Sequence, residues 1–267
     1  MKILVTGATG KVGSRLVRRL ARRGDHLRAL VRKPVPIDGV EIVVGDLLDP
    51  GSLAAAVTGV DAIVHCAAFF RGATDEQAHA TNDLGTQHLA RAAAAANVKR
   101  FVFTSTGNVY GGTNGALVNE DAECHPTAAY PVSKLAAEKF LLALPDLDVR
   151  VLRLPFVYGD GDPHIAEIVP YMKTFPPEMR MTVAHHADIG QAVERILDKA
   201  QPTYRIYNVT ADEAPTLAQM FASVGAPPPD GSTAGRAQAF RTLMDGTRIR
   251  ADLGFKPEFP TLASAVT

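Results

Sequence analysis

The strongest limit on the fold comes from short apolar runs that alternate with segments of helical periodicity. The six runs are KILVTG (2–7), LRALVR (27–32), EIVVGD (41–46), DAIVHCAA (61–68), RFVFTST (100–106) and VRVLRL (149–154). Because these runs are continuously apolar, they predict strands that are covered on both faces. Between them, apolar residues recur at helical spacing in segments 12–20, 84–96 and 132–143. This order of elements predicts an α/β fold with a doubly wound parallel sheet.

A glycine-rich turn, TGATGKVG at residues 6–13, follows the first run directly. Gly7 and Gly10 allow a sharp turn and the close approach of a pyrophosphate, and Gly13 allows a helix to pack closely on a strand. The start of the next helix offers unpaired N–H groups to the phosphates. A strand before this pattern and an amphipathic helix after it indicate a dinucleotide-binding (Rossmann) fold. The predicted cofactor contacts in the turn are Gly7, Thr9, Gly10, Lys11, Val12 and Gly13.

The residues that end the second strand bear on the choice of nicotinamide cofactor. An acid there accepts hydrogen bonds from the adenosine ribose, whereas a cation can meet a 2′-phosphate. Here the strand ends in Arg32 and Lys33, and the first acid that follows is Asp38. The planar guanidinium of Arg32 suits a phosphate, so NADP is favoured and NAD remains possible. The alternative is that both cations are ordinary surface residues.

The ends of the later strands supply further predicted cofactor contacts. Asp46 is placed to accept a hydrogen bond from the adenine amino group. The small residues that end the fourth run let a cofactor lie against the chain. The predicted contacts at the third, fourth and fifth strand ends are Asp46, Leu47, Cys66, Ala67, Ala68 and Thr104.

The strand–helix pattern loosens after residue 154, where a Pro-rich and His-containing stretch begins. A helix (ADIGQAVERIL) and a late strand (YRIYNVT) then return to it. We therefore predict a dinucleotide-binding domain at residues 1–154, to which 187–210 return. Residues 155–186 and 211–267 would form a small, interleaved C-terminal lobe that binds substrate.

The segment AYPVSK (129–134), which precedes a run of good helix formers, predicts an acid–base pair at a helix start. Pro131 suits an early helical position, because its missing N–H would have no partner there. Tyr130 and Lys134 then share one helical face at i and i+4. A cation about 4 Å away can lower a phenol pKa of about 10 by roughly three units. Lys134 would thus make Tyr130 a usable acid or base.

A further group must orient the oxygen of the substrate. The fifth run ends in Thr104-Ser105-Thr106, and Gly107 follows. Thr106 is the candidate and Ser105 the alternative. The predicted catalytic residues are therefore Thr106, Tyr130 and Lys134.

Five motifs in a fixed order give the chain a family resemblance from about residue 2 to 257. They are TGxxGxxG (6–13), TSTGNVYG (104–111), Tyr130-xxx-Lys134, RLPFVYG (153–159) and HHADIG (185–190). The chain resembles an extended short-chain dehydrogenase/reductase of the NAD-dependent epimerase/dehydratase family.

The resemblance implies roles for several residues. Thr106, four positions before Tyr110, matches the family's catalytic hydroxyl. Lys134 would hold the nicotinamide ribose as well as tune Tyr130, and Asn82 matches an asparagine near that ribose. Leu154 and residues 155–157 correspond to the segment that closes over the nicotinamide, with Pro155 and Val157 as cofactor contacts.

Three functions remain open from the sequence. The first is net oxidoreduction, in which hydride passes between the nicotinamide and a carbonyl or secondary alcohol. The second is epimerisation of a sugar or sugar nucleotide with transient hydride transfer. The third is a non-catalytic NADP-binding sensor, although such relatives usually lose the tyrosine–lysine pair. Dehydration is disfavoured, because dehydratases of the family carry Asp-Glu where this chain has Gly107-Asn108.

The resemblance also bears on the substrate. Sugar-nucleotide enzymes of the family tend to be longer and to carry an asparagine where Leu154 follows Arg153 here. The short segment between Gly159 and His186 leaves little chain to grip a nucleoside diphosphate. A small metabolite or free sugar is therefore the favoured substrate.

Charge and composition exclude several other classes. With 28 basic and 28 acidic residues, the net charge is zero, so neither nucleic acid nor a membrane surface is an expected partner. The lack of a long apolar run or signal-peptide pattern favours a cytoplasmic location. Metal binding is not expected, because the adjacent His185 and His186 would point apart. The resemblance suggests a homodimer formed through helices at 75–96 and 128–143.

Overall fold

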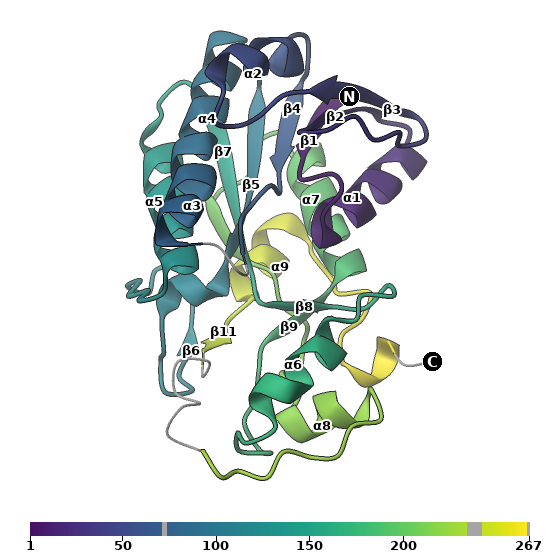
Figure 1. The fold of residues 1–267 in the computed structure, drawn as a ribbon, viewed down its shortest axis with the longest axis vertical. Coiled ribbons are helices and arrows are strands. Elements are labelled where there is room, and N and C mark those ends of the chain that lie inside the picture. Colours follow the sequence, from purple (N-terminus) through teal and green to yellow (C-terminus); the bar gives the residue numbers. More distant parts are fainter. Residues whose placement is uncertain (71–73, 234–241, 266–267) are drawn as a thin grey trace. The chain divides into compact units, whose positions relative to one another are not determined.

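The computed structural model describes residues 1–70, 74–233 and 242–265. A seven-stranded sheet has the order β10-β7-β5-β4-β1-β2-β3 (Figure 1). Its strands are β1 (Lys2–Thr6), β2 (His26–Val31), β3 (Val40–Val44), β4 (Ala62–His65), β5 (Arg100–Thr106), β7 (Asp148–Leu154) and β10 (Ile206–Asn208). The pairings of β1 with β2 and β4, of β2 with β3, and of β4 with β5 are parallel. The predicted doubly wound α/β fold is confirmed.

One predicted strand is less covered than its sequence suggested. β3 is the edge strand of the sheet, and Val44 at its end is 54% exposed. The prediction that every apolar run is covered on both faces is therefore wrong for β3, in which every residue is exposed or half-buried. By contrast, every residue of β5 is buried.

The chain folds into two compact units. The first comprises Met1–Ser105, Thr127–Leu152 and Val193–Ile206, and the second comprises Thr106–Pro126, Arg153–Ala192 and Tyr207–Thr267. The assignment of the cofactor to one domain and of the substrate to the other stays a prediction. Within the described ranges, every helix is too short or too polar to span a bilayer.

In the first unit, helices cover both faces of the sheet. They are α1 (Lys11–Arg22), α2 (Pro50–Val57), α3 (Asp75–Ala78), the π-helical η1 (His79–Leu84), α4 (Gly85–Ala95) and α5 (Ala129–Ala143). Leu53 of α2, Leu89 of α4 and Leu141 of α5 share one core with Ile63 and Phe101 of the sheet. Figure 1 shows α4 and α5 together on one side of the sheet and α1 on the other.

The arginines of α1 do not all face solvent. Arg19 pairs with Glu194 at 2.9 Å and Arg23 pairs with Asp198 at 2.6 Å, so both reach α7 (His186–Asp198). Arg15, nearer the start of α1, donates to the Lys11 carbonyl in its own helix. Two ion pairs therefore join the C-terminal end of α1 to α7.

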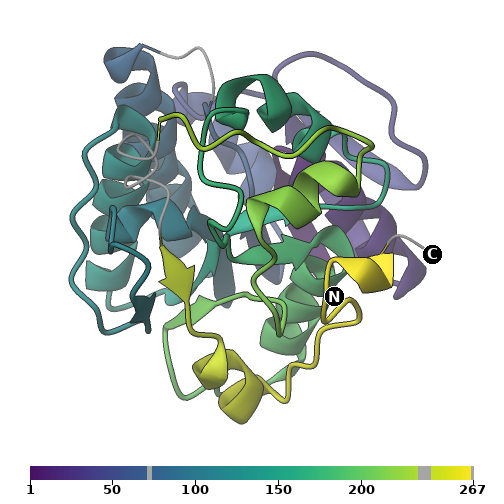
Figure 2. The same cartoon turned by 90° about the horizontal axis from the view of Figure 1, so that it is seen from below.

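The second unit is built from short elements. They are η2 (Gly107–Tyr110), β6 (Leu117–Val118), β8 (Phe156–Tyr158), α6 (His164–Met172), β9 (Val183–His185), α8 (Leu217–Ala222), β11 (Leu243–Met244), α9 (Thr247–Leu253) and η4 (Ala263–Ala265). β6 pairs with β11 and β8 with β9, both parallel. Ile168 and Met172 of α6 and Met220 and Phe221 of α8 contribute to one apolar core. Figure 2 shows α6 and α8 of this unit from below, in teal-green and light green.

Candidate functional site

The glycine turn between β1 and α1 is shaped by contacts that exclude a side chain. Gly7 has φ +68°, and a Cβ added there would lie 2.7 Å from the Ala67 nitrogen. A Cβ on Gly13 would lie 2.1 Å from the Gly7 carbonyl oxygen. Gly10 is the N-cap residue of α1, and as a glycine it places no side chain over the first turn of this helix. The turn therefore presents bare N–H groups at the helix start, which is the requirement for binding a phosphate.

The end of β4 is fixed by a buried histidine that the sequence did not single out. His65 lies between two hydroxyls, with Nδ1 2.6 Å from Thr6 Oγ1 and Nε2 2.8 Å from Thr86 Oγ1. Burial, and to a smaller extent the charge of Lys134, lower the pKa of His65 well below its usual value. A neutral imidazole thus ties β4 to β1 and to α4, and it holds the Cys66–Ala68 segment beside Gly7.

Asn82, in η1, bonds to the backbone of Phe69, the residue that follows the Cys66–Ala68 segment. Its Oδ1 accepts from the Phe69 N–H at 2.7 Å, and its Nδ2 donates to the Phe69 carbonyl at 2.9 Å and to Ser133 Oγ at 3.0 Å. Ser133 in turn donates to the Tyr130 carbonyl at 2.8 Å. Asn82 therefore positions the residues around Tyr130 and Lys134, and its contact with a ribose stays a prediction.

α5 begins at Ala129, so Pro131 lies in its first turn as predicted. The half-buried Tyr130 meets the Phe70 ring edge to face, with centroids 4.7 Å apart. Lys134 is 1% exposed, and its Nζ lies 3.8 Å above the Phe103 ring. Among the described residues, none forms a hydrogen bond or ion pair with this ammonium. A buried lysine in this state is suited to the hydroxyl groups of a bound ligand.

The charge state of Lys134 in the free protein differs from that of a surface lysine. Burial lowers its pKa to about 7, although Cys66 and Glu138 act in the opposite direction. Part of the population is therefore uncharged near pH 7. Hydrogen bonds to the charged form would raise this pKa, so a ligand that accepts from Nζ would strengthen the predicted effect on Tyr130.

We expect this buried lysine to make stability depend on pH. Between pH 7 and 10.5 the unfolded chain keeps the proton that the folded chain has lost, so the unfolding free energy rises with pH. Urea unfolding at pH 7 and 9 should show wild type gaining about 2 kcal/mol relative to Lys134→Met. The control Lys139→Met, at an exposed position of α5, should show no such gain. A constant difference between wild type and Lys134→Met would mean that Lys134 is fully charged in the fold.

Other predicted cofactor residues also lie at the carboxyl ends of the strands. Arg32 follows β2 in the sequence and is exposed, whereas Leu47 follows β3 in the sequence and is buried. The Asp46 carboxylate accepts from the Leu48 N–H at 2.9 Å. Thr104 Oγ1 donates to the His65 carbonyl at 3.1 Å. Burial raises the pKa of the Cys66 thiol to about 11, so this thiol stays protonated and is no nucleophile.

Thr106 ends β5 and opens the second unit, whereas Tyr130 and Lys134 belong to the first. Its Oγ1 accepts from the Asn108 N–H at 3.2 Å and so caps η2. The alternative Ser105 is buried, and its Oγ has no hydrogen-bond partner among the described residues. That Thr106, Tyr130 and Lys134 act together stays a prediction.

The residue after Thr106 is covered by a methionine. A Cβ on Gly107 would lie 2.3 Å from Met244 Sδ and 3.1 Å from its Cε. Met244 is buried, and its N–H donates to Thr182 Oγ1 at 2.9 Å. An acid at position 107 would therefore displace Met244. This contact could not be predicted from the sequence, because 137 positions separate the two residues.

The segment predicted to close over the nicotinamide forms β8. Val157 pairs with Ala184 of β9, and its carbonyl lies 2.8 Å from His164 Nδ1. Pro155 precedes this strand and is half-buried. The contacts of Pro155 and Val157 with a cofactor stay predictions.

The two histidines of the HHADIG segment have separate partners. The His185 ring packs on Phe259 at 3.8 Å between centroids, and His186 Nε2 lies 2.9 Å from Asp162 Oδ2. Across the residues that the structure describes, no three His, Cys, Asp or Glu side chains form a group that could hold a metal ion.

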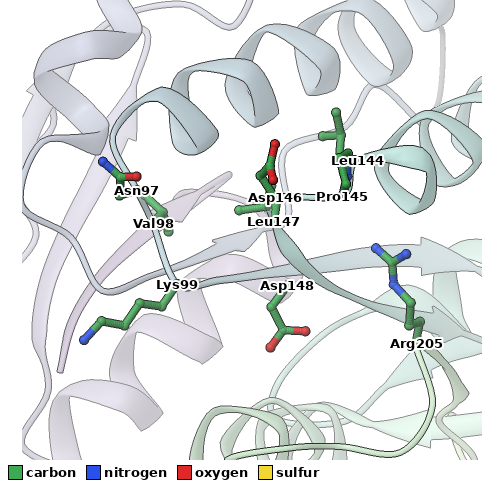
Figure 3. Close-up of a pocket in the computed structure, with 9 residues that line it drawn as sticks. All are labelled: Asn97, Val98, Lys99, Leu144, Pro145, Asp146, Leu147, Asp148 and Arg205. Atoms are coloured by element: carbon green, nitrogen blue, oxygen red, sulfur yellow. The ribbon is translucent and has the colours of Figure 1, made fainter.

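A cavity of about 560 Å³ lies at the other end of the strands, where β5 and β7 begin (Figure 3). It is lined by Asn97, Val98, Lys99, Leu144, Pro145, Asp146, Leu147, Asp148 and Arg205. None of the predicted site residues lines this cavity, and its charged groups are of both signs. It therefore gives no support to the predicted chemistry.

Comparison with known proteins identifies the family. The family model described as "NAD dependent epimerase/dehydratase family" matches residues 3–174 of the 267 residues. A 3 beta-hydroxysteroid dehydrogenase/Delta 5→4-isomerase of Mycobacterium tuberculosis is 35% identical over 178 residues, which are 60% of this chain and 48% of the relative. A 2-alkyl-3-oxoalkanoate reductase of Stenotrophomonas maltophilia is 35% identical, over 62% of this chain and 55% of its own length. A UDP-glucose 4-epimerase of Vibrio cholerae is 35% identical, over 60% of this chain and 52% of its own length.

The chain thus spans about half the length of the curated relatives that it matches. Solved structures match over the whole chain. MoeE5 in complex with UDP-glucuronic acid and NAD is 27% identical, with a TM-score of 0.84 over 100% of this chain and 96% of that one. A short-chain dehydrogenase/reductase superfamily protein from Agrobacterium tumefaciens with bound NAD is also 27% identical, with a TM-score of 0.80 and the same coverage.

The family match, the parallel sheet and the glycine turn agree with the resemblance seen in the sequence motifs. The chain belongs to the NAD dependent epimerase/dehydratase family, within the extended short-chain dehydrogenase/reductase superfamily of nicotinamide-dependent enzymes.

Proposed function

We propose that the protein is an oxidoreductase that transfers a hydride between NAD(P) and a carbonyl or secondary alcohol of a small metabolite or sugar. The observation that carries this proposal is the Lys134 ammonium, which is buried and has no hydrogen-bond partner among the described residues. A buried cation without partners is costly, and ribose hydroxyls at that position would lower the cost. The side-chain-free turn at Gly7 and Gly13 supports a dinucleotide as the source of that ribose.

Each predicted catalytic residue has one task in this reaction. The nicotinamide, when bound, supplies or accepts the hydride. In reduction, Tyr130 gives a proton to the carbonyl oxygen, and in oxidation it takes the proton from the alcohol. Lys134 holds the cofactor ribose and favours the phenolate form of Tyr130. Thr106 orients the substrate oxygen through its hydroxyl group.

Net oxidoreduction is favoured over elimination of water by the contact between Gly107 and Met244. Elimination needs an acid or base next to the hydroxyl group that leaves, and at position 107 an acid would displace the thioether. Epimerisation is the second candidate, because the matched epimerase acts on UDP-glucose and MoeE5 binds UDP-glucuronic acid with NAD.

Three of the described arginines of the second unit weigh against a nucleoside diphosphate as the substrate. Arg180 donates to the Ala214 carbonyl, Arg248 pairs with Glu120 and Asp121, and Arg250 pairs with Asp212. Each of these guanidinium groups is therefore already engaged within the unit. The matched oxoalkanoate reductase and steroid dehydrogenase also fit a carbonyl or alcohol substrate without a diphosphate.

The test is a substrate panel with NADPH, NADP, NADH and NAD. Ketones, aldehydes, polyols, free sugars and UDP-sugars would each be incubated with the protein while the nicotinamide absorbance near 340 nm is followed. Net oxidation or reduction of a ketone, polyol or sugar is the expected result. Interconversion of sugar isomers without a net absorbance change would favour the epimerase, and cofactor binding with no turnover of any compound would contradict both.

We further propose that NADP is the preferred cofactor, although MoeE5 and the Agrobacterium protein hold NAD. Arg32 supports this proposal, because it is exposed at the end of β2 and no ion pair occupies it among the described residues. Arg32→Asp should weaken NADP binding by tenfold or more and leave NAD binding within about threefold. Calorimetric titration of both cofactors measures this, with Arg22→Asp on α1 as the control. Equal losses for both cofactors would contradict the preference.

A homodimer through α4 and α5 is also proposed. The apolar side chains of Leu84, just before α4, and of Val132 in α5 are 40% and 46% exposed, which is unusual for helices that cover a sheet. Light scattering after size exclusion should give twice the chain mass of 28.4 kDa. Val132→Glu should reduce the measured mass to that of a single chain.

A further inference from the structure

Asn208, at the end of β10, is a buried polar side chain of the second unit with hydrogen bonds from both ends of its amide. It is 0% exposed, and its Oδ1 accepts from the Tyr110 hydroxyl at 2.7 Å. Its Nδ2 donates to the Asp245 carbonyl at 3.0 Å and to the Val118 carbonyl at 3.4 Å. One amide therefore joins three segments that are far apart in the sequence.

Two of these segments carry the residues next to the candidate catalytic hydroxyl. Tyr110 is the last residue of η2, the short helix that Thr106 caps. Asp245 follows Met244, the residue that covers Gly107. The Asp245 N–H also donates to the Val118 carbonyl at 2.8 Å. Asn208 therefore bonds at once to the turn that begins at Thr106 and to the segment that packs on this turn.

The surroundings of Asn208 keep it in one orientation. Its backbone N–H donates to Glu120 Oε1 at 2.8 Å, and Glu120 Oε2 lies 3.4 Å from Arg248 Nε. The Arg153 guanidinium lies 4.8 Å from the centre of the Tyr110 ring. Burial raises the pKa of Tyr110 to about 12, so its hydroxyl stays protonated and donates. The amide orientation follows, because only the oxygen of Asn208 can accept from Tyr110.

We infer that Asn208, together with Tyr110, is a positioning residue that holds the Thr106 turn and Met244 in register with each other. The inference rests on the proposed function, since it gives Thr106 the task of orienting the substrate oxygen. Losing the hydrogen bond from the Tyr110 hydroxyl would leave the buried Asn208 Oδ1 unpaired and let η2 shift. Small displacements of a group that orients the substrate lower turnover more than they lower binding.

The test compares Tyr110→Phe with Tyr207→Phe. Tyr207 is the control: it adjoins Asn208 on β10, is fully buried, and also loses one hydroxyl bond, in its case to the Asp252 carboxylate. Both variants should lose thermal stability, because each removes one hydroxyl bond. Only Tyr110→Phe should lower kcat, by about tenfold, with the cofactor Kd unchanged and with a larger primary isotope effect from deuterated nicotinamide. Equal kcat in the two variants would overturn the inference.

Hydrogen exchange gives a readout that needs no substrate. In Tyr110→Phe, amides of residues 107–111 and 243–246 should exchange faster than in wild type, and in Tyr207→Phe they should not. Asn208→Ala should increase both effects, and Tyr110→Phe still decides if that variant does not fold. Faster exchange in a protein that turns over no substrate would reject the proposed function alone. Unchanged exchange of amides 243–246 in Tyr110→Phe would reject only the inference that Asn208 and Tyr110 join the Thr106 turn to the Met244 segment.

Discussion

Tyr130→Phe should lower turnover by on the order of 10² or more while the cofactor Kd stays within about twofold of wild type. The hydroxyl group is the only part of Tyr130 that is lost, so the edge-to-face contact of its ring with Phe70 remains. The hydrogen bond from Ser133 to the Tyr130 carbonyl also remains, because it uses the backbone. The loss should therefore be confined to proton transfer. Initial rates with the best compound of the substrate panel, and fluorescence titration of the cofactor, measure the two quantities.

Tyr171→Phe is the matched control for this experiment. Tyr171 is 75% exposed on α6, so the same chemical change there should leave both kcat and cofactor Kd unchanged. A Tyr130→Phe protein as active as the control would remove Tyr130 from the mechanism. A Tyr130→Phe protein that fails to bind cofactor would show instead that the hydroxyl group serves binding.

The elements that could be predicted from the sequence are those whose pattern is local. The run at 100–106 is β5, and each of its residues is buried, as its continuous apolar composition predicts. The exposure of the run at 41–46 could not be predicted, because nothing in its composition shows that β3 lies at an edge of the sheet. Pro131 predicted the start of α5 within two residues, since proline is restricted to the first turn.

The parts of the site that escaped prediction depend on contacts between distant positions. His65 meets Thr6, 59 residues earlier, and Asn82 meets Ser133, 51 residues later. No periodicity encodes such pairs. The lowered pKa of Lys134 also follows from burial, which the sequence spacing of Tyr130 and Lys134 does not report. The spacing therefore identified a pair of residues, and the tertiary packing determines the charge that one of them carries.

The glycine turn allows folding and cofactor binding to be separated, because its glycines are needed for different reasons. A Cβ at Gly13 would lie 2.1 Å from the Gly7 oxygen and 2.7 Å from the Gly7 carbon, and both atoms belong to the backbone. Neither can rotate away, so α1 must shift relative to the turn. Gly13→Ala should lower the unfolding free energy by about 1–3 kcal/mol and abolish measurable cofactor binding.

Gly10→Ala is the matched variant in the same turn. Apart from its chain neighbours, a Cβ there meets one atom of the described residues within 4 Å, the Gly7 oxygen at 3.2 Å, so the fold can accommodate it with a small adjustment. The added methyl group would still stand at the start of α1, where a pyrophosphate must approach the backbone. Gly10→Ala should therefore unfold within about 0.5 kcal/mol of wild type in urea and bind cofactor at least tenfold more weakly. If Gly10→Ala bound cofactor as tightly as wild type, the phosphates would have to lie elsewhere than at the start of α1.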